Sequence, residues 1–150
     1  DRTVRTIASR GGRAVLGWSM GGAGAVKFAC KYPDLFSSAV SFSGGFTTGE
    51  FEKPRHPEVF KKMFADDVKR FDDQSALGLA RTGGGKVPLR LAVGTKDVLW
   101  EPNRKMKAVL EQLKIGFEYE EIEGVAHNPP LVFEAQGLKA FKFHARHFRP

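Results

Sequence analysis

A serine flanked by two glycines lies near the start of the chain, where residues 17–21 read Gly-Trp-Ser-Met-Gly. An apolar segment precedes this pattern, and the small residues 22–25 follow it. The combination predicts a nucleophile elbow: a strand, a tight turn with Ser19 at its tip, and a helix. We expect side chains at Gly17 and Gly21 to clash with the turn, and the backbone N–H of Met20 to donate a hydrogen bond to an oxyanion.

A serine hydroxyl becomes a useful nucleophile only with a base beside it and an acid that orients the base. Asp97 and His127 each follow a segment that reads as a strand, as Ser19 does. Functional groups gather beyond the carboxyl ends of parallel strands, so we expect these three side chains to meet. For Asp97 the alternative is ordinary turn chemistry.

The remaining histidines and aspartates fit this role less well by position. His56 lies in an irregular middle segment, and His144 and His147 lie in the predicted last helix, where solvent-facing or capping roles are expected. The competing acids resemble helix caps or exposed faces; they are Asp66, Asp67, Asp72 and Asp73.

The elements that must position these residues alternate between strands and helices. The expected strands are 13–17, 38–42, 89–93 and 118–122, and the expected helices are 20–32, 101–113 and 131–148. Residues 1–9 are read as the tail of a helix that Gly11 and Gly12 end. Residues 46–85 form an irregular segment with helical patches at 58–64, 66–71 and 74–80. The fold class is α/β, with a parallel sheet of about four strands flanked by helices in one domain spanning residues 1–150.

Composition restricts the function classes. The chain has 150 residues, a net charge of +7 and one cysteine, Cys30, which we expect to be a buried, inert thiol. No apolar run reaches the length of a membrane span, and no basic and aromatic pattern indicates nucleic-acid binding. We expect no metal and no cofactor. The compartment is unknown, with the cytoplasm favoured over secretion because no signal peptide is recognisable.

A family resemblance joins these observations. Residues 17–25, then Tyr-Pro-Asp-Leu-Phe at 32–36 and Ser-Phe-Ser-Gly at 41–44, resemble the α/β-hydrolase superfamily. The resemblance is narrower to the branch that contains feruloyl esterases, S-formylglutathione hydrolases and esterase D, and it runs from about Ile7 to about His127. It implies a serine hydrolase with a Ser–Asp–His chain order, and an insertion at 46–85 that acts as a lid, with a solvated helical excursion as the alternative.

The resemblance covers only the C-terminal half of that domain, so a truncated α/β-hydrolase fold is expected. The second oxyanion donor normally comes from a loop before the elbow, and we expect the N–H of Gly44 or Gly45 to substitute. The strand at 13–17 would then be an unpaired sheet edge. We therefore expect a homo-oligomer that covers this edge.

Two functions follow from these patterns. The first is an esterase that hydrolyses small carboxylic esters, with short-chain or aromatic acyl groups, through an acyl-serine intermediate. Its residues are Ser19, Asp97, His127 and the N–H of Met20, with Trp18 and Trp100 lining a substrate pocket or, alternatively, packing in the core. The second is a catalytically impaired half-domain that serves as an assembly or binding module. A basic surface that binds polyanions is a third reading without a motif behind it.

Overall fold

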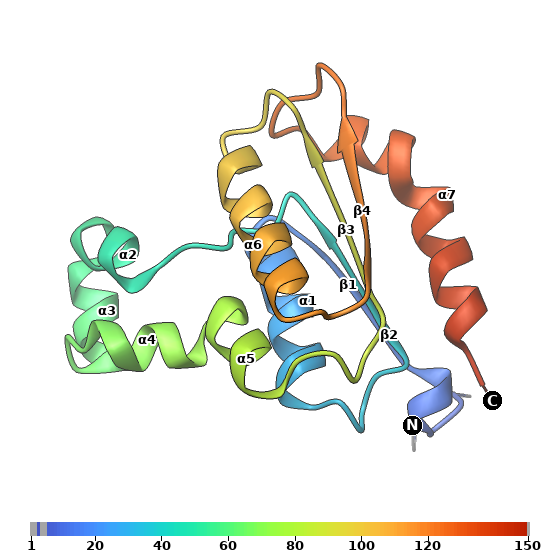
Figure 1. The fold of residues 1–150 in the computed structure, drawn as a ribbon, viewed down its shortest axis with the longest axis horizontal. Coiled ribbons are helices and arrows are strands. Elements are labelled where there is room, and N and C mark those ends of the chain that lie inside the picture. Colours follow the sequence, from blue (N-terminus) through green and yellow to red (C-terminus); the bar gives the residue numbers. More distant parts are fainter. Residues whose placement is uncertain (1–2, 4–5, 150) are drawn as a thin grey trace.

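The computed structural model describes residue 3 and residues 6–149, and its centre is a four-stranded parallel sheet with helices on both faces (Figure 1). The strands lie in chain order and every neighbouring pair is parallel. They are β1 (Ala14–Trp18), β2 (Ser38–Phe42), β3 (Leu89–Gly94) and β4 (Phe117–Ile122). The predicted α/β class with a four-stranded parallel sheet is confirmed, and β1 and β4 are its two edges.

Helices make the crossovers that parallel strands require. Within the described residues the crossover helices are α1 (Met20–Lys31), α2 (Gly49–Arg55), α3 (Pro57–Phe64), α4 (Val68–Gln74), α5 (Ala76–Gly83) and α6 (Trp100–Gln112). Helix α7 (Pro129–His147) follows the last strand, and a 3-10 turn η1 at Arg10–Gly12 precedes the first. Figure 1 shows α1, α5 and α6 on one face of the sheet and α7 on the other, while α2, α3 and α4 project sideways from it.

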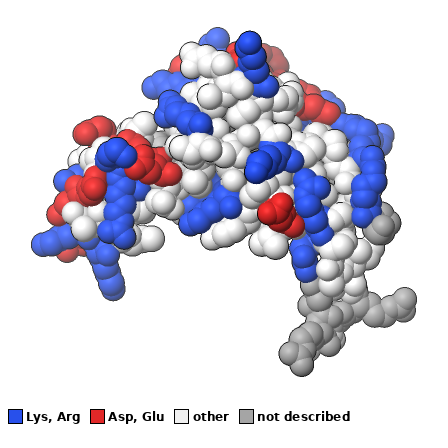
Figure 2. All heavy atoms as spheres, turned by 60° about the horizontal axis from the view of Figure 1, so that its bottom comes forward, with Lys and Arg blue, Asp and Glu red and all other residues white. Residues whose placement is uncertain are grey.

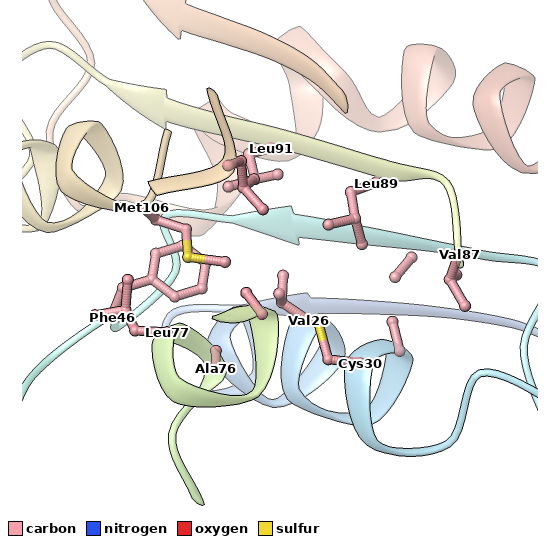
Figure 3. Packing of buried hydrophobic residues seen from close by; sticks show 13 residues of the cluster. Val26, Cys30, Phe46, Ala76, Leu77, Val87, Leu89, Leu91 and Met106 are labelled. Atoms are coloured by element: carbon pink, nitrogen blue, oxygen red, sulfur yellow. The ribbon is translucent and has the colours of Figure 1, made fainter. Parts of the chain in front are cut away.

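The larger apolar core lies between the sheet and the first helical face (Figure 3). Leu89 and Leu91 of β3 meet Val26 of α1 and Met106 of α6 there, and all four are almost fully buried. The other side of the same strands packs on α7 through a second cluster; its buried members are Val40, Phe42, Ala92, Val132, Ala140 and Phe143. Cys30 belongs to the first core, and burial raises its thiol pKa to about 11, which agrees with the expected inert thiol.

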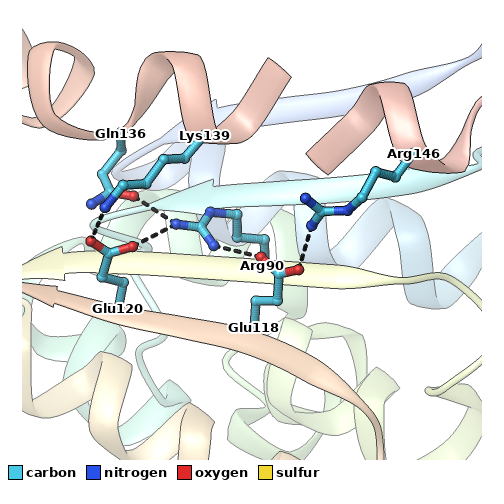
Figure 4. Close-up of polar contacts among 6 residues, drawn as sticks. All are labelled: Arg90, Glu118, Glu120, Gln136, Lys139 and Arg146. Atoms are coloured by element: carbon cyan, nitrogen blue, oxygen red, sulfur yellow. Dashed lines mark hydrogen bonds and ion pairs between the residues drawn. The ribbon is translucent and has the colours of Figure 1, made fainter. Parts of the chain in front are cut away.

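A polar network lies between β3, β4 and α7 (Figure 4). Arg90 is a charged residue in an otherwise apolar buried strand, and its guanidinium binds Glu118 at 2.6 Å and Glu120 at 2.7 Å. Burial alone would raise the pKa of Glu120, but hydrogen bonds from Lys139, Gln136 and Arg90 outweigh it and lower the pKa to about 2. The two glutamates face α7 because Phe117 and Tyr119, at alternate positions of β4, pack on the first core.

Two local predictions are wrong. Residues 6–8 have no regular structure, and Arg10–Gly12 form only the short turn η1; the other residues of the expected leading helix, 1, 2, 4 and 5, lie outside the described part. The segment instead packs on the C-terminus, where the N–H of Arg149 donates to the carbonyl of Gly11 at 3.0 Å. Helix α2 was not expected, because residues 49–55 were assigned to the irregular part of the middle segment; Pro54 falls in its last turn and disrupts little.

None of the helices in the described ranges is both long enough and apolar enough to cross a membrane. On the face drawn in Figure 2, Lys and Arg side chains lie over much of the surface, with Asp and Glu interspersed.

Candidate active site

Ser19 occupies a strained turn between β1 and α1. Its backbone angles are φ 58° and ψ −121°, a region that residues with side chains rarely adopt. The turn is held from both sides, because the Ser19 N–H donates to the carbonyl of Phe42 at 2.8 Å and its carbonyl accepts from the N–H of Gly45 at 2.9 Å. The strand, turn and helix predicted from the motif are therefore present, with Ser19 at the tip.

Close approach at this turn depends on Gly17 and Gly22. A Cβ at Gly17 would lie 1.9 Å from the carbonyl oxygen of Gly21, so the expectation for Gly17 holds. A Cβ at Gly21 would meet nothing within 4 Å, so the expected clash there is wrong. The second contact is instead at Gly22, where a Cβ would lie 2.7 Å from Ser41 Oγ and 2.9 Å from the carbonyl oxygen of Phe42. Helix α1 thus lies directly on the end of β2.

The structure brings Ser19, His127 and Asp97 together in one chain of hydrogen bonds. His127 Nε2 lies 3.0 Å from Ser19 Oγ, and His127 Nδ1 lies 2.9 Å from both carboxylate oxygens of Asp97. The Asp97 side chain is fully buried, whereas 26% of the His127 side chain is exposed. Because a carboxylate accepts, Nδ1 donates to Asp97 and Nε2 presents its lone pair to the serine hydroxyl. This arrangement can carry a proton away from Ser19 Oγ.

Asp97 and His127 are held in place by the loops after β3 and β4. Gly94 ends β3 directly beneath the loop after β4, since a Cβ there would lie 2.0 Å from the carbonyl oxygen of Val125. The same carbonyl accepts from the N–H of Lys96 at 3.0 Å, and Thr95 Oγ1 accepts from the N–H of Gly124 at 2.9 Å. Asp97 is oriented further by the N–H of Leu99, which donates to its Oδ1 at 2.8 Å.

Of the three backbone N–H groups predicted as oxyanion donors, that of Met20 is free to bind an oxyanion, and those of Gly44 and Gly45 are not. Met20 is the first residue of α1, where backbone N–H groups have no partner within the helix. The N–H of Gly44 donates to Asn103 Oδ1 at 3.3 Å and that of Gly45 to the carbonyl of Ser19. The expectation that Gly44 or Gly45 substitutes as second donor is therefore wrong, because both N–H groups hold the loop against the elbow.

Asn103 is a positioning residue that the sequence reasoning missed. It is fully buried on α6, and its Nδ2 donates to the carbonyls of Gly44 and Leu99, both at 2.8 Å. Gly44 leads into the Gly45 contact with Ser19, so Asn103 ties α6 to the elbow. Its signal in the sequence was a polar residue one turn before Met106, on the apolar face of a predicted helix.

A cavity of about 780 Å³ opens beside Ser19. Its apolar wall comes largely from the segment 46–85; it includes Phe46, Phe51, Phe64, Phe71 and Leu77, with Val98 opposite. Residues 46–85 thus flank the candidate site, and their action as a lid stays a prediction.

Neither predicted pocket tryptophan is among the residues that line this cavity. The Trp18 ring instead lies against the His127 imidazole, with centroids 4.1 Å apart. The Trp100 ring packs under the guanidinium of Arg104, 4.7 Å from its centroid. The geometry therefore favours a positioning role for Trp18 over contact with a ligand.

The other histidines are placed differently from one another. His56 lies at the exposed mouth of the cavity. The expectation of a solvent-facing or capping role is wrong for His144, since it is 6% exposed and its Nδ1 lies 2.8 Å from Ser38 Oγ of β2. Burial, together with nearby His147, lowers the His144 pKa. Among the described residues, no three His, Cys, Asp or Glu side chains gather in a way that could hold a metal ion.

Comparison with known proteins gives the family. Residues 1–127 match the model of the esterase family described as "Putative esterase". Esterase MT1326 of Mycobacterium tuberculosis is 60% identical over 44 residues, which are 29% of this chain and 10% of that protein.

Two solved structures share the fold. An S-formylglutathione hydrolase from Agrobacterium tumefaciens has a TM-score of 0.82 at 20% identity, over 99% of this chain and 53% of that one. An S-formylglutathione hydrolase from Staphylococcus aureus has a TM-score of 0.78 at 18% identity, over 95% of this chain and 58% of that one. The chain spans little more than half the length of these structures. With the family model matched over most of its residues, the chain belongs to this esterase family of the α/β-hydrolase fold.

Proposed function

We propose that this chain carries the catalytic triad of a serine esterase, which hydrolyses carboxylic esters through an acyl-serine intermediate. The observation that supports this most directly is the hydrogen-bond chain from Ser19 Oγ through His127 to Asp97, with distances of 3.0 and 2.9 Å. The strained elbow places the half-buried serine on the wall of the adjoining cavity, which offers a place for substrate.

In the acylation step, Ser19 Oγ attacks the ester carbonyl carbon while His127 Nε2 takes the hydroxyl proton. The carbonyl oxygen becomes an oxyanion that accepts from the N–H of Met20 at the start of α1. The carbon–oxygen bond to the alcohol then breaks, and His127 returns its proton to the leaving alkoxide. Asp97 keeps the imidazole in the required orientation and stabilises its protonated form.

In the deacylation step, a water molecule takes the place of the alcohol. His127 removes a proton from the water, whose oxygen attacks the acyl carbon, and the bond to Ser19 breaks. The proton returns to Ser19 Oγ and the carboxylic acid leaves. The aromatic wall formed by Phe46, Phe51, Phe64 and Phe71 supports short-chain or aromatic acyl groups as substrates.

Hydrolysis of p-nitrophenyl acetate and p-nitrophenyl butyrate by the purified chain tests this function. Ser19→Ala should lower kcat by about 10⁶-fold, and a fluorophosphonate probe should label the wild-type chain but not this variant. Thr48→Ala, a change at the N-cap of α2 away from the hydrogen-bond chain, is the control variant and should keep the wild-type turnover. Turnover that survives Ser19→Ala would overturn the assignment.

The second candidate, a half-domain that acts as an assembly or binding module, is favoured by one observation. Only one oxyanion donor, the N–H of Met20, is available among those predicted, since Gly44 and Gly45 are engaged elsewhere. Loss of one donor typically costs about 10²–10³ in turnover. A folded chain that neither turns over esters nor takes up the fluorophosphonate would favour this module.

A homo-oligomer is proposed on the basis of the sheet edge. Strand β1 pairs with β2 alone among the described strands, and its outer edge carries unpaired backbone groups. We expect two copies to pair through β1. Light scattering at micromolar concentration should give a dimer. Because the Ser19 N–H donates to β2 and backbone directions alternate along a strand, the Ala14 N–H faces the open edge, so an Ala14→Pro variant, which removes that donor, should weaken the dimer. A stable wild-type monomer would contradict the proposal.

A further inference from the structure

One wall of the cavity is a single stripe of helix α1. Met20, Ala23, Gly24 and Lys27 all line the cavity, at the spacing that places residues on the same helical face. The stripe begins next to Ser19, and its middle residues are small. It therefore forms an open channel floor that leads from the serine hydroxyl to an amino group.

Lys27 is a cation without a counterion. Within the described part of the chain, no hydrogen bond or ion pair joins its amine to another side chain, and the amine is half-buried. Burial lowers the Lys27 pKa, and repulsion from Lys31 lowers it further. Lys31, one turn along the helix, is exposed and donates to Gln74 Oε1 at 3.3 Å. Withdrawing an amine from water without a partner is unfavourable, so an anion that reached Lys27 would be held.

Two other charged residues, Arg55 and Glu52, line the cavity together with His56. The Arg55 guanidinium is 4.8 Å above the Phe51 ring, and both residues are exposed. Glu52 lies 3.8 Å from the imidazole of His56. Lys27 is thus less exposed than Arg55, the other Lys or Arg side chain that lines the cavity, and it has no acidic partner among the described residues.

We propose that the preferred substrates are esters with a negatively charged group, a carboxylate or a phosphate, at the end remote from the ester bond, and that Lys27 binds this group. The inference rests on the proposed function. Lys27 lies eight positions after Ser19, so their backbones lie about 12 Å apart along the helix at its normal rise. Helical side chains lean toward the N-terminus, which brings the amine closer to the serine. The anion should therefore be separated from the ester by a chain of medium length.

The test uses matched pairs of activated esters. Mono-p-nitrophenyl esters of dicarboxylic acids, from succinate to dodecanedioate, are compared with p-nitrophenyl alkanoates of equal length. A second series places a carboxylate or a phosphate on the alcohol side. The wild-type chain should prefer the charged member in kcat/KM by roughly ten- to hundredfold at a medium length in one series.

Variants then assign the preference to Lys27. Lys27→Met should bring the charged-to-neutral ratio close to one, and Lys27→Arg should restore most of it. Lys31→Met, on the same helix but outside the cavity, should keep the wild-type ratio. Gly24→Leu fills the channel floor, where a Cβ meets nothing within 4 Å, and should lower turnover of medium-length esters relative to acetate.

The outcomes separate this inference from the proposed function. Turnover of neutral esters with a charged-to-neutral ratio near one at every length would overturn the role of Lys27 and leave the esterase intact. A ratio that falls equally in Lys31→Met and Lys27→Met would also overturn it, because general surface charge would then explain the preference. Failure to turn over any ester, charged or neutral, would remove both proposals.

Discussion

Replacing Gly22 by alanine tests whether close packing of α1 on β2 holds the candidate nucleophile in place. The new Cβ would lie 2.7 Å from Ser41 Oγ, 2.9 Å from the carbonyl oxygen of Phe42 and 3.1 Å from the Cα of Gly44. The serine hydroxyl can rotate away, but the two backbone atoms cannot. Helix α1 must therefore move away from β2, and Ser19, which begins that helix, moves with it.

The magnitude follows from two opposing effects. Overpacking of this kind costs about 1–3 kcal/mol, and alanine in a helix gains about 1 kcal/mol over glycine. We expect a net loss of up to about 2 kcal/mol in the free energy of unfolding, or a Tm lower by up to about 8 °C for a chain of this size. A shift of the hydroxyl away from the His127 imidazole should also reduce kcat on p-nitrophenyl acetate by about tenfold.

Gly24→Ala is the matched control for stability, two residues further along the same helix. A Cβ at Gly24 meets nothing within 4 Å, so only the helix propensity changes. This variant should be more stable than the wild type by about 0.5–1 kcal/mol. The measurement is urea and thermal denaturation followed by circular dichroism, with ester turnover at a temperature where both variants are folded. If Gly22→Ala gains stability as Gly24→Ala does, the close contact is not a constraint and the reasoning is refuted.

Three further outcomes are expected. Asn103→Leu leaves the buried backbone groups of Gly44 unpaired, so the free energy of unfolding measured by urea denaturation should fall by about 2–4 kcal/mol and kcat should fall as well. Full turnover in a destabilised variant would refute the link between Asn103 and the elbow. Trp18→Leu should lower kcat and leave KM nearly constant, whereas Trp100→Leu should change neither; a raised KM in both would instead indicate a substrate pocket. The His144 pKa is lower in the folded chain than its ordinary value of 6.5. Its contribution to stability is therefore complete above pH 6.5 and is lost as the pH falls through the pKa of the folded state. The unfolding free energy should therefore drop between pH 7 and pH 5 by more in the wild type than in His144→Gln, and equal pH dependence would contradict the assignment.

The sheet could be predicted because three of its strands are short, mostly apolar runs and the fourth, β4, alternates apolar residues with glutamates. β2 was expected at 38–42 and is found at Ser38–Phe42, and the bounds of the other strands differ by one residue. The meeting of Ser19, Asp97 and His127 could also be predicted, because it requires only that parallel strands end at the same edge. Their catalytic roles stay a prediction until turnover is measured.

Other features depend on contacts between segments that no local pattern reveals. The sequence motif assigns equal importance to Gly17 and Gly21, yet the second close approach is at Gly22, because it is set by where β2 ends. His144 was expected to have a solvent-facing or capping role, but its position on α7 turns it toward Ser38 of β2. Arg90 in β3 makes sense only once Glu118 and Glu120 of β4 lie beside it.

These contacts indicate how the elbow keeps its strained geometry. A left-handed φ at Ser19 costs of order 1–3 kcal/mol, and the turn by itself offers nothing to offset it. The compensation comes from its neighbours: β2 accepts the Ser19 N–H, Gly45 donates to the Ser19 carbonyl, and Asn103 holds the loop that carries Gly45. Because α6 begins right after the loop that bears Asp97, the same helix anchors both the turn of the nucleophile and the acid that orients the base. Loosening α6 should therefore disturb both ends of the hydrogen-bond chain at once.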